Sequence, residues 1–376
     1  MRIGIVREIK EDEYRVAVTP AGVREMVEHD NEVLVETGAG AGSAITDGDY
    51  EAQGARIVTA PEDVFAEAEM ILHVKELQPE EIARLRPGQL LFTYLHLAPD
   101  PEQTRALVDS GAICIAYETV EDTQGRLPLL APMSEIAGKI ATQAGAFMLE
   151  KPLGGRGILL GGGPGVAAAN VMVIGGGVVG MNAAFIAIGM EADVFVYDTS
   201  IDRLRELDVI FNGRCSTVFS NVLSIEERLP AADLVIGAVL VHGARAPRVI
   251  RREQLALMKP GAVLVDVAID QGGCFETSRP TAHRDPTYEV DGIIHYCVAN
   301  MPGAVPITST QALTNATMPY AVKLATLGLE EALRRDSGLR PGVNVANGRV
   351  THPAVAEATG HEHAPVEEAL QLQTAN

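Results

Sequence analysis

Short apolar runs alternate with amphipathic segments through the first third of the chain. The pattern predicts strands over 3–6, 32–36, 56–58, 70–74, 89–95 and 112–117, and helices over 20–29, 61–68, 79–85 and 101–109. Thr19 and Pro20 are residue types that favour the N-cap and the first position of a helix. Because predicted strands and helices alternate, we expect a parallel, doubly wound sheet and an α/β fold.

A second series of strands and helices follows in the middle of the chain. Strands are predicted over 171–174, 193–197, 216–219, 232–240, 262–269 and 293–299, and helices over 134–149, 181–190, 200–207, 224–229 and 308–327. Ser134 is expected to be the N-cap of the first of these helices. The continuous apolar runs 232–240 and 262–269 are typical of buried parallel strands. The tail after residue 342 predicts a small hairpin and a helix.

The stretch VMVIGGGVVGMNAAFIAIGMEADVFVYD, residues 171–198, carries a dinucleotide-binding pattern. Gly175, Gly177 and Gly180 have G-x-G-x-x-G spacing between a predicted strand and a predicted helix, and Asp198 closes the next strand. The helix N-terminus would offer free N–H groups to a pyrophosphate. The acid would accept hydrogen bonds from ribose hydroxyls, which favours NAD over NADP. The alternative is a glycine-rich turn in an ordinary α/β domain.

These patterns together predict two domains. The nucleotide unit, residues 132–305, is expected to be a Rossmann domain inserted into the other one. Residues 1–131 and 306–376 would then form a discontinuous substrate domain with its own doubly wound sheet.

Composition narrows the class of protein further. Apolar residues make up 47% of the 376 positions, enough for two cores, yet no run reaches the roughly 18 apolar residues of a membrane span. The N-terminus lacks a signal-peptide pattern, and the four cysteines are scattered, so a cytoplasmic protein without a metal site is expected. The formal net charge of −20 argues against binding to nucleic acid, whose phosphates would be repelled.

Three basic side chains follow strands predicted for the first domain. Arg15 stands in EYRVAVTP, and Lys75 and His96 come directly after strands 70–74 and 89–95. Ligands bind at the carboxyl ends of parallel strands, so these positions are favourable for a site. A guanidinium matches a carboxylate, a lysine can bind a carboxylate or polarise a carbonyl, and a histidine can exchange protons near neutral pH.

Each of these side chains also has an alternative interpretation. Arg15 could be a surface residue paired with one of the nearby acids at positions 11–13. Lys75 could form a surface pair with Glu76. His96 could be a structural histidine.

Asp270 closes the run VDVAIDQGG, where the nicotinamide end of a cofactor is expected. An acid there could orient a water or accept a proton, or it could simply cap the QGG turn. Asp266 would lie inside the strand. His283 and His295 are interpreted as structural.

The sequence strongly resembles the alanine dehydrogenase family, which shares its fold with the NAD-binding subunit of proton-translocating transhydrogenase. The resemblance covers nearly the whole chain and is carried by MRIGIVREIK, YRVAVTPAGV, ILHVKELQP, LFTYLHLA, PMSEIAGK, VIGGGVVG, LVDVAIDQGGCFETSRPT, HYCVANMPGAVP and TSTQALTNATMPY. It is far more specific than the glycine motif alone.

The resemblance implies a role for each candidate. Arg15 and Lys75 would bind the amino-acid or keto-acid substrate, and His96 and Asp270 would be the catalytic acid/base pair. The NAD site would be formed by Ser134, Gly175, Gly177, Val178, Val179, Gly180, Asp198, Arg203, Ser220, Val239, Leu240, Val267, Arg279, Val298, Asn300 and Met301. Ile307 is a departure, because many relatives carry a basic residue there; local contacts at that position are expected to differ.

The implied function is the reversible NAD-dependent oxidative deamination of L-alanine to pyruvate and ammonium by a homo-oligomer, usually a hexamer in this family. The main alternative is the NAD(H)-binding subunit of a transhydrogenase, although the sequence has no Arg-Gln-Asp loop and no membrane segment. A saccharopine-type dehydrogenase, which needs room for a larger substrate, and a non-catalytic NAD sensor are further alternatives.

Overall fold

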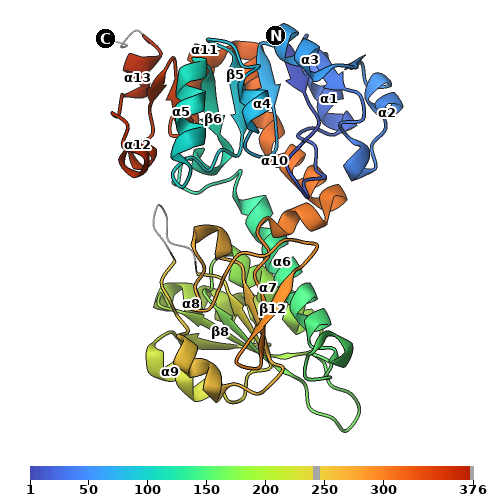
Figure 1. The fold of residues 1–376 in the computed structure, drawn as a ribbon, viewed down its shortest axis with the longest axis vertical. Helices are drawn as coiled ribbons and strands as arrows, with labels where there is room; N and C mark the ends of the chain where they lie inside the picture. Colours follow the sequence, from blue (N-terminus) through green and yellow to red (C-terminus); the bar gives the residue numbers. More distant parts are fainter. Residues whose placement is uncertain (240–245, 373–376) are drawn as a thin grey trace. The chain divides into compact units, whose positions relative to one another are not determined.

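A computed structural model describes residues 1–239 and 246–372 of the chain (Figure 1). The chain divides into two units, which are taken separately below. Unit 1 comprises residues 1–133 and 305–376, and unit 2 comprises residues 134–304. Two long segments of the chain thus build unit 1, and the second of them begins only after unit 2 is complete.

Unit 1 contains an eight-stranded sheet. Its strands are β1 (Arg2–Ile5), β2 (Glu32–Glu36), β3 (Arg56–Val58), β4 (Met70–Leu72), β5 (Leu90–Thr93), β6 (Ile113–Ala116), β14 (Val343–Ala346) and β15 (Arg349–Val350). They lie in the order β15-β14-β6-β5-β4-β1-β2-β3. The six strands from β1 to β6 are parallel, whereas β14 and β15 add an antiparallel edge. An Asn-Gly pair with positive φ at both residues, 347–348, joins these last two strands, as expected for a two-residue hairpin.

Helices cover both faces of this sheet. They are α1 (Pro20–Glu28), α2 (Asp47–Glu51), α3 (Pro61–Glu67), α4 (Pro79–Ile82), α5 (Pro101–Ser110), α10 (Pro306–Leu327), α11 (Leu329–Arg335), α12 (Pro353–Thr359) and α13 (Val366–Ala369). One core joins Leu34, Ile71 and Leu91 of β2, β4 and β5 to Val64 of α3 and Leu107 of α5. Helix α1 packs against α10 so closely that a Cβ on Gly22 would meet Met318 at 2.9 Å. Figure 1 shows α12 (red) close to α5 in the same unit.

Unit 2 contains a seven-stranded sheet built on the same plan. Its strands are β7 (Asn170–Ile174), β8 (Asp193–Asp198), β9 (Ser216–Phe219), β10 (Leu234–Gly237), β11 (Val263–Asp266), β12 (Thr287–Val290) and β13 (Ile293–Tyr296), in the order β12-β13-β11-β10-β7-β8-β9. All neighbouring pairs are parallel except β12 and β13. The expectation of two α/β units with doubly wound sheets is confirmed, with antiparallel strands added only at one edge of each sheet.

Helices also cover both faces of the second sheet. They are α7 (Val178–Gly189), α8 (Ile201–Phe211) and α9 (Val222–Arg228), together with α6 (Ala131–Met148), which continues from unit 1 into unit 2. Met172, Val235 and Leu264 on one face pack with Ile225 of α9. On the other face α6 lies against α7, where the Thr142 hydroxyl donates a 2.8 Å hydrogen bond to the Ala183 carbonyl (Figure 1).

The structure corrects several predicted boundaries. Helix α6 begins at Ala131, so Ser134 lies in its first turn and the expectation that it is the N-cap was wrong. Pro132 fits there because the first amides of a helix need no helical partner. Helix α7 begins at Val178 rather than Met181. Within the described part of the run 232–240, a strand forms only over β10. Among the described residues, no helix is long and apolar enough to cross a membrane.

Candidate active site

The two sheets share one strand order, and the candidate residues follow the strands at its centre. In unit 1 the strand order reverses between β1 and β4: β2 and β3 extend the sheet to one side of β1, and β4 to β6 extend it to the other. In unit 2 the same reversal falls between β7 and β10. A crevice at the carboxyl ends of two such strands is the usual ligand position in doubly wound sheets. In unit 1 the loops after β1, β4, β5 and β6 carry charged or titratable side chains, whereas in unit 2 three glycines follow β7.

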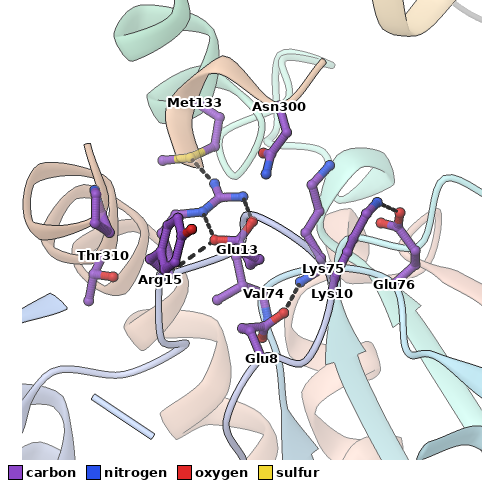
Figure 2. Close-up of polar contacts among 12 residues, drawn as sticks. Glu8, Lys10, Glu13, Arg15, Val74, Lys75, Glu76, Met133, Asn300 and Thr310 are labelled. Carbon is purple, nitrogen blue, oxygen red and sulfur yellow. Dashed lines mark hydrogen bonds and ion pairs between the residues drawn. The ribbon is translucent and has the colours of Figure 1, made fainter. Parts of the chain in front are cut away.

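Arg15 is buried, with 2% of its surface exposed, and is held by a carboxylate. Its Nε and Nη2 donate hydrogen bonds of 2.7 and 2.6 Å to the two oxygens of Glu13, and Nη1 lies 3.0 Å from the sulfur of Met133 (Figure 2). Although burial favours the neutral form, the hydrogen bonds and the charge of Glu13 raise the pKa of Arg15. The group is therefore a permanent cation whose plane is fixed before any ligand binds.

Lys75 is also buried, and its backbone is clamped on both sides. Glu8 accepts hydrogen bonds of 2.7 and 3.2 Å from the backbone amides of Val74 and Lys75 (Figure 2). The Lys75 carbonyl accepts a 2.8 Å hydrogen bond from the hydroxyl of Thr93. Neither Arg15 nor Lys75 is thus a surface residue. Each is a buried cation, Arg15 in the loop between β1 and α1 and Lys75 just after β4, which suits the binding of an anionic ligand.

His96 follows β5 in a left-handed backbone conformation, with φ of 49°. Glu118, in the 3-10 turn η2 (Tyr117–Thr119) after β6, holds this conformation because it accepts the amides of Leu95 and His96, the latter at 2.6 Å. The imidazole ring lies beside the ring of Tyr94, with centroids 5.9 Å apart. A strained backbone held by a dedicated partner is typical of functional positions.

A buried ionic triad of Glu8, His73 and Glu81 contacts the backbone of Lys75. His73, 1% exposed, lies 3.1 Å from Glu8 through Nδ1 and 3.2 Å from Glu81 through Nε2, and its Nδ1 is also 2.7 Å from the Lys75 carbonyl. Burial raises the pKa of Glu8 to about 7 despite the charge of His73. The two glutamates outweigh burial and raise the pKa of His73 to about 9. With acceptors facing both ring nitrogens, the imidazolium form fits the geometry.

In unit 2 the glycine turn has the shape of a phosphate cradle. Gly175 has φ of 104°, and a Cβ on Gly180 would lie 1.8 Å from the Gly175 carbonyl oxygen. A Cβ on Gly177, by contrast, would meet nothing within 4 Å, so the backbone borders open space there. Gly177 is the N-cap of α7 and makes no side-chain cap bond. The first amides of the helix, which have no helical acceptor, therefore suit the pyrophosphate of a dinucleotide.

Two charged residues brace this turn. The Asp198 carboxylate, at the end of β8, accepts the amides of Gly176 and Ser200, each at 2.8 Å. Nε of Arg203 on α8 donates a 2.7 Å hydrogen bond to the Gly176 carbonyl. The acid expected to meet the ribose thus lies beside the glycine turn.

Most of the other cofactor candidates follow the carboxyl ends of neighbouring strands. Ser220 and Val267 directly follow β9 and β11, and Val239 and Val298 lie two residues after the ends of β10 and β13. Val178 and Val179 form the first turn of α7, Asn300 and Met301 lie at the start of η6 (Met301–Ala304), and Arg279 lies over the ring of Tyr288 at 4.0 Å. Leu240 lies outside the described residues.

Asp270 is exposed in the 3-10 turn η5 (Ile269–Gln271) after β11. Asp266, the last residue of β11, is fully buried and organises the loop that follows. It accepts the amides of Ala268 and Cys274 at 3.0 and 2.9 Å, and the hydroxyl of Ser278 also donates to it. Burial raises the pKa of Asp266 despite these donors.

Sequence reasoning named Glu13 and Glu76 only as possible surface partners of Arg15 and Lys75, and it missed the roles of Glu8 and Glu118. In the structure Glu8 and Glu13 are buried. The available signal was their place after a predicted strand, next to a basic candidate.

Comparisons with known proteins place the chain in a family. Residues 4–137 match the family described as alanine dehydrogenase/PNT, N-terminal domain, and residues 141–353 match its C-terminal domain. The chain belongs to the alanine dehydrogenase/PNT family. An alanine dehydrogenase from Halomonas elongata is 58% identical over 363 residues, covering 96% of this chain and 98% of that protein.

Solved structures agree with this assignment. A structure titled L-alanine dehydrogenase has a TM-score of 0.93 at 49% identity and covers 96% of this chain and 99% of its own. A transhydrogenase from Sinorhizobium meliloti has a TM-score of 0.81 at 25% identity, with 94% and 100% covered. The family expected from the sequence is confirmed.

Proposed function

We propose that the protein is an L-alanine dehydrogenase, an NAD-dependent oxidoreductase that converts L-alanine reversibly into pyruvate and ammonium. The observation that carries this proposal is the near full-length similarity to alanine dehydrogenases, at 58% identity for the Halomonas elongata enzyme. The side chains that such a reaction needs are present: two buried cations for a carboxylate and a histidine at the end of the neighbouring strand.

In this proposal Arg15 and Lys75 hold the carboxylate of the substrate. Their positions are set in advance by Glu13 and Glu8, so little ordering is left for the moment of binding. Their positive charge also favours a deprotonated substrate amine, which loss of hydride from Cα requires. Bound NAD⁺ would accept that hydride.

His96 and Asp270 are the proposed acid/base groups. His96 takes a proton from the water that attacks the imine and returns one to the leaving amine. Asp270, on an exposed turn after β11, would help to orient that water. The glycine turn, its helix N-terminus and Asp198 are the proposed NAD site, and the carboxylate would repel the extra phosphate of NADP.

The transhydrogenase alternative is less well supported, because the similarity to the transhydrogenase structure is 25% identity against 49% for the L-alanine dehydrogenase structure. That alternative requires hydride exchange between NAD and NADP rather than turnover of an amino acid. The homo-hexamer and the cytoplasmic location expected from the sequence stay predictions. Light scattering after size-exclusion chromatography tests the first.

The test of the proposed function is NADH absorbance with purified protein. Oxidation of NADH is expected with pyruvate and ammonium together and not with either alone, and reduction of NAD⁺ is expected with L-alanine. NADP⁺ and NADPH serve as controls and should give at least about a hundredfold lower rates. Binding of NADH without turnover of any amino acid would instead favour the sensor or transhydrogenase interpretations.

A further inference from the structure

Two buried polar atoms face each other behind the imidazole of His96. Oε2 of Glu76 and Nδ1 of His96 are 3.6 Å apart. Both atoms are shielded from solvent, and neither has a hydrogen-bond partner among the residues that the structure describes. Leaving two such groups unpaired is costly, so a small rotation that closes the distance is favourable.

We propose that Glu76 and His96 form a carboxylate–imidazole dyad in which Glu76 is a positioning residue for the proton chemistry of His96. A carboxylate at Nδ1 keeps the hydrogen on that nitrogen, and Nε2 is then the atom that exchanges a proton. This inference rests on the proposed function for its catalytic consequence, but the dyad itself does not depend on which substrate is used.

The exposure of the ring agrees with this orientation. The His96 side chain is 38% exposed although Nδ1 is buried, so the accessible part of the ring lies away from Glu76. The backbone of His96 is also held in place. Glu118 accepts a hydrogen bond from its amide and so fixes its left-handed conformation. Hydrogen bonds of catalytic groups are often long before the ligand binds and shorten in the complex.

The charge on Glu76 is secured by cations on two other loops. Lys10, after β1, pairs with Oε1 of Glu76 (Figure 2). The other oxygen, Oε2, faces Nδ1 of His96. Burial alone would raise the pKa of Glu76, but His96, Lys75 and Lys10 together lower it. Glu76 therefore stays ionised at every pH at which such an enzyme works. The positive charge of Lys10 partly offsets the electrostatic effect of the Glu76 carboxylate on the imidazole ring of His96.

Other charged or titratable groups around the ring are Glu118, whose carboxylate is engaged by backbone amides, and Tyr94, whose hydroxyl donates to the Leu129 carbonyl. Burial raises the pKa of Tyr94, which keeps it neutral. The negative charge that is aimed at the imidazole and balanced by Lys10 is therefore that of Glu76.

The test compares Glu76→Gln with Lys10→Gln, using Glu80→Gln as the matched control. Glu80 is an exposed acid on α4, only four residues further along the chain. The first readout uses no substrate: carbethoxylation of His96 by diethyl pyrocarbonate is followed against pH by peptide mass spectrometry. The second readout is kcat and KM for pyruvate as a function of pH.

Glu76→Gln is expected to move the pH midpoint of His96 modification to lower pH by roughly one unit, because an anion that favours the protonated ring is lost. Lys10→Gln is expected to move it the opposite way, and Glu80→Gln to leave it in place. For Glu76→Gln, kcat should fall about tenfold to hundredfold, part of the roughly 10² to 10⁴ that a positioned acid/base group contributes. KM for pyruvate should change little, and Glu76→Asp should restore part of kcat.

Opposite shifts cannot arise from a general loss of structure, so they separate a dyad from a structural role. If Glu76→Gln and Lys10→Gln both leave the midpoint where Glu80→Gln leaves it, the dyad is wrong, whatever the enzyme does with alanine. If the midpoints shift as expected while the wild-type protein fails to turn over alanine, the dyad holds and the proposed substrate is wrong.

Discussion

The two sheets of this protein have the same central strand order but use it differently. In unit 2, residues 175–177 alone separate the end of β7 from α7, and a glycine turn brings the helix N-terminus to the sheet. In unit 1, residues 6–19 separate β1 from α1, and this longer loop carries Glu8, Lys10, Glu13 and Arg15. The loop after β7 presents backbone amides, and the loop after β1 presents charged side chains.

These two loops are made rigid in different ways. A backbone cradle needs no partner, because sterics fix it: Gly180 leaves no room for a Cβ beside the Gly175 carbonyl. Buried cations need counter-charges, since an unpaired charge in the interior is strongly unfavourable. Glu13 supplies that partner for Arg15, and Glu8 clamps the backbone that carries Lys75.

The largest expected effect on cofactor binding comes from filling the glycine cradle. In Gly180→Ala the new Cβ would meet a backbone oxygen at 1.8 Å, so the turn or the helix must move. The Kd for NADH, measured by fluorescence titration, should rise about a hundredfold or more. Gly189→Ala, at the other end of the same helix, would meet no atom within 4 Å and should bind NADH normally. Equal affinities in the two variants would remove the cofactor site from this turn.

A smaller and selective loss is expected from Arg15→Lys. An ammonium cannot reproduce the planar fork that Glu13 holds, so KM for pyruvate should rise about tenfold to hundredfold. The Kd for NADH should not change. Arg24→Lys, on the exposed face of α1, is the matched control and should behave as wild type. An Arg15→Lys variant with an unaltered KM would mean that this guanidinium does not hold the substrate.

The triad of Glu8, His73 and Glu81 is expected to affect stability rather than ligand binding or turnover. The pKa of His73 is raised from 6.5 to about 9 in the folded state, so its stabilisation is complete below pH 6.5 and disappears as pH rises through 9. The stability advantage of wild type over His73→Gln should therefore shrink by about 3 kcal/mol between pH 6 and 9.5. Urea unfolding at fixed protein concentration measures it, with His29→Gln as an exposed control. A pH-independent difference would contradict the charged triad.

Local patterns were sufficient for the central strands and for the glycine turn. The alternation of apolar runs predicted β1 to β6, and the spacing of Gly175, Gly177 and Gly180 predicted the start of a helix in the correct region. The boundaries were less predictable: the helix that was predicted to begin at residue 181 already includes Val178 and Val179, whose β-branched side chains are less favourable in helices. Strand β12 was missed, and it lies at a sheet edge, where the alternation is weak.

The partners of the candidate site could not be predicted in the same way. Glu13 and Glu8 are buried in the loop after β1, and Glu8 contacts the backbone of Val74 after β4, a long-range arrangement that no local pattern encodes. The contact between Glu76 and His96 joins two loops after different strands. Sequence reasoning therefore found the cations and the histidine, and the structure added the carboxylates that fix them.

In this proposal unit 2 binds the cofactor, and His96 of unit 1 carries out proton transfer. Measuring NADH affinity and turnover together in His96→Ala tests whether these two roles are separate. We expect kcat for the reductive amination of pyruvate to fall about 10² to 10⁴-fold while the Kd for NADH stays within about twofold of wild type. Near-full activity in that variant would contradict the acid/base role of His96. A parallel loss of NADH binding would contradict the separation of the two sites.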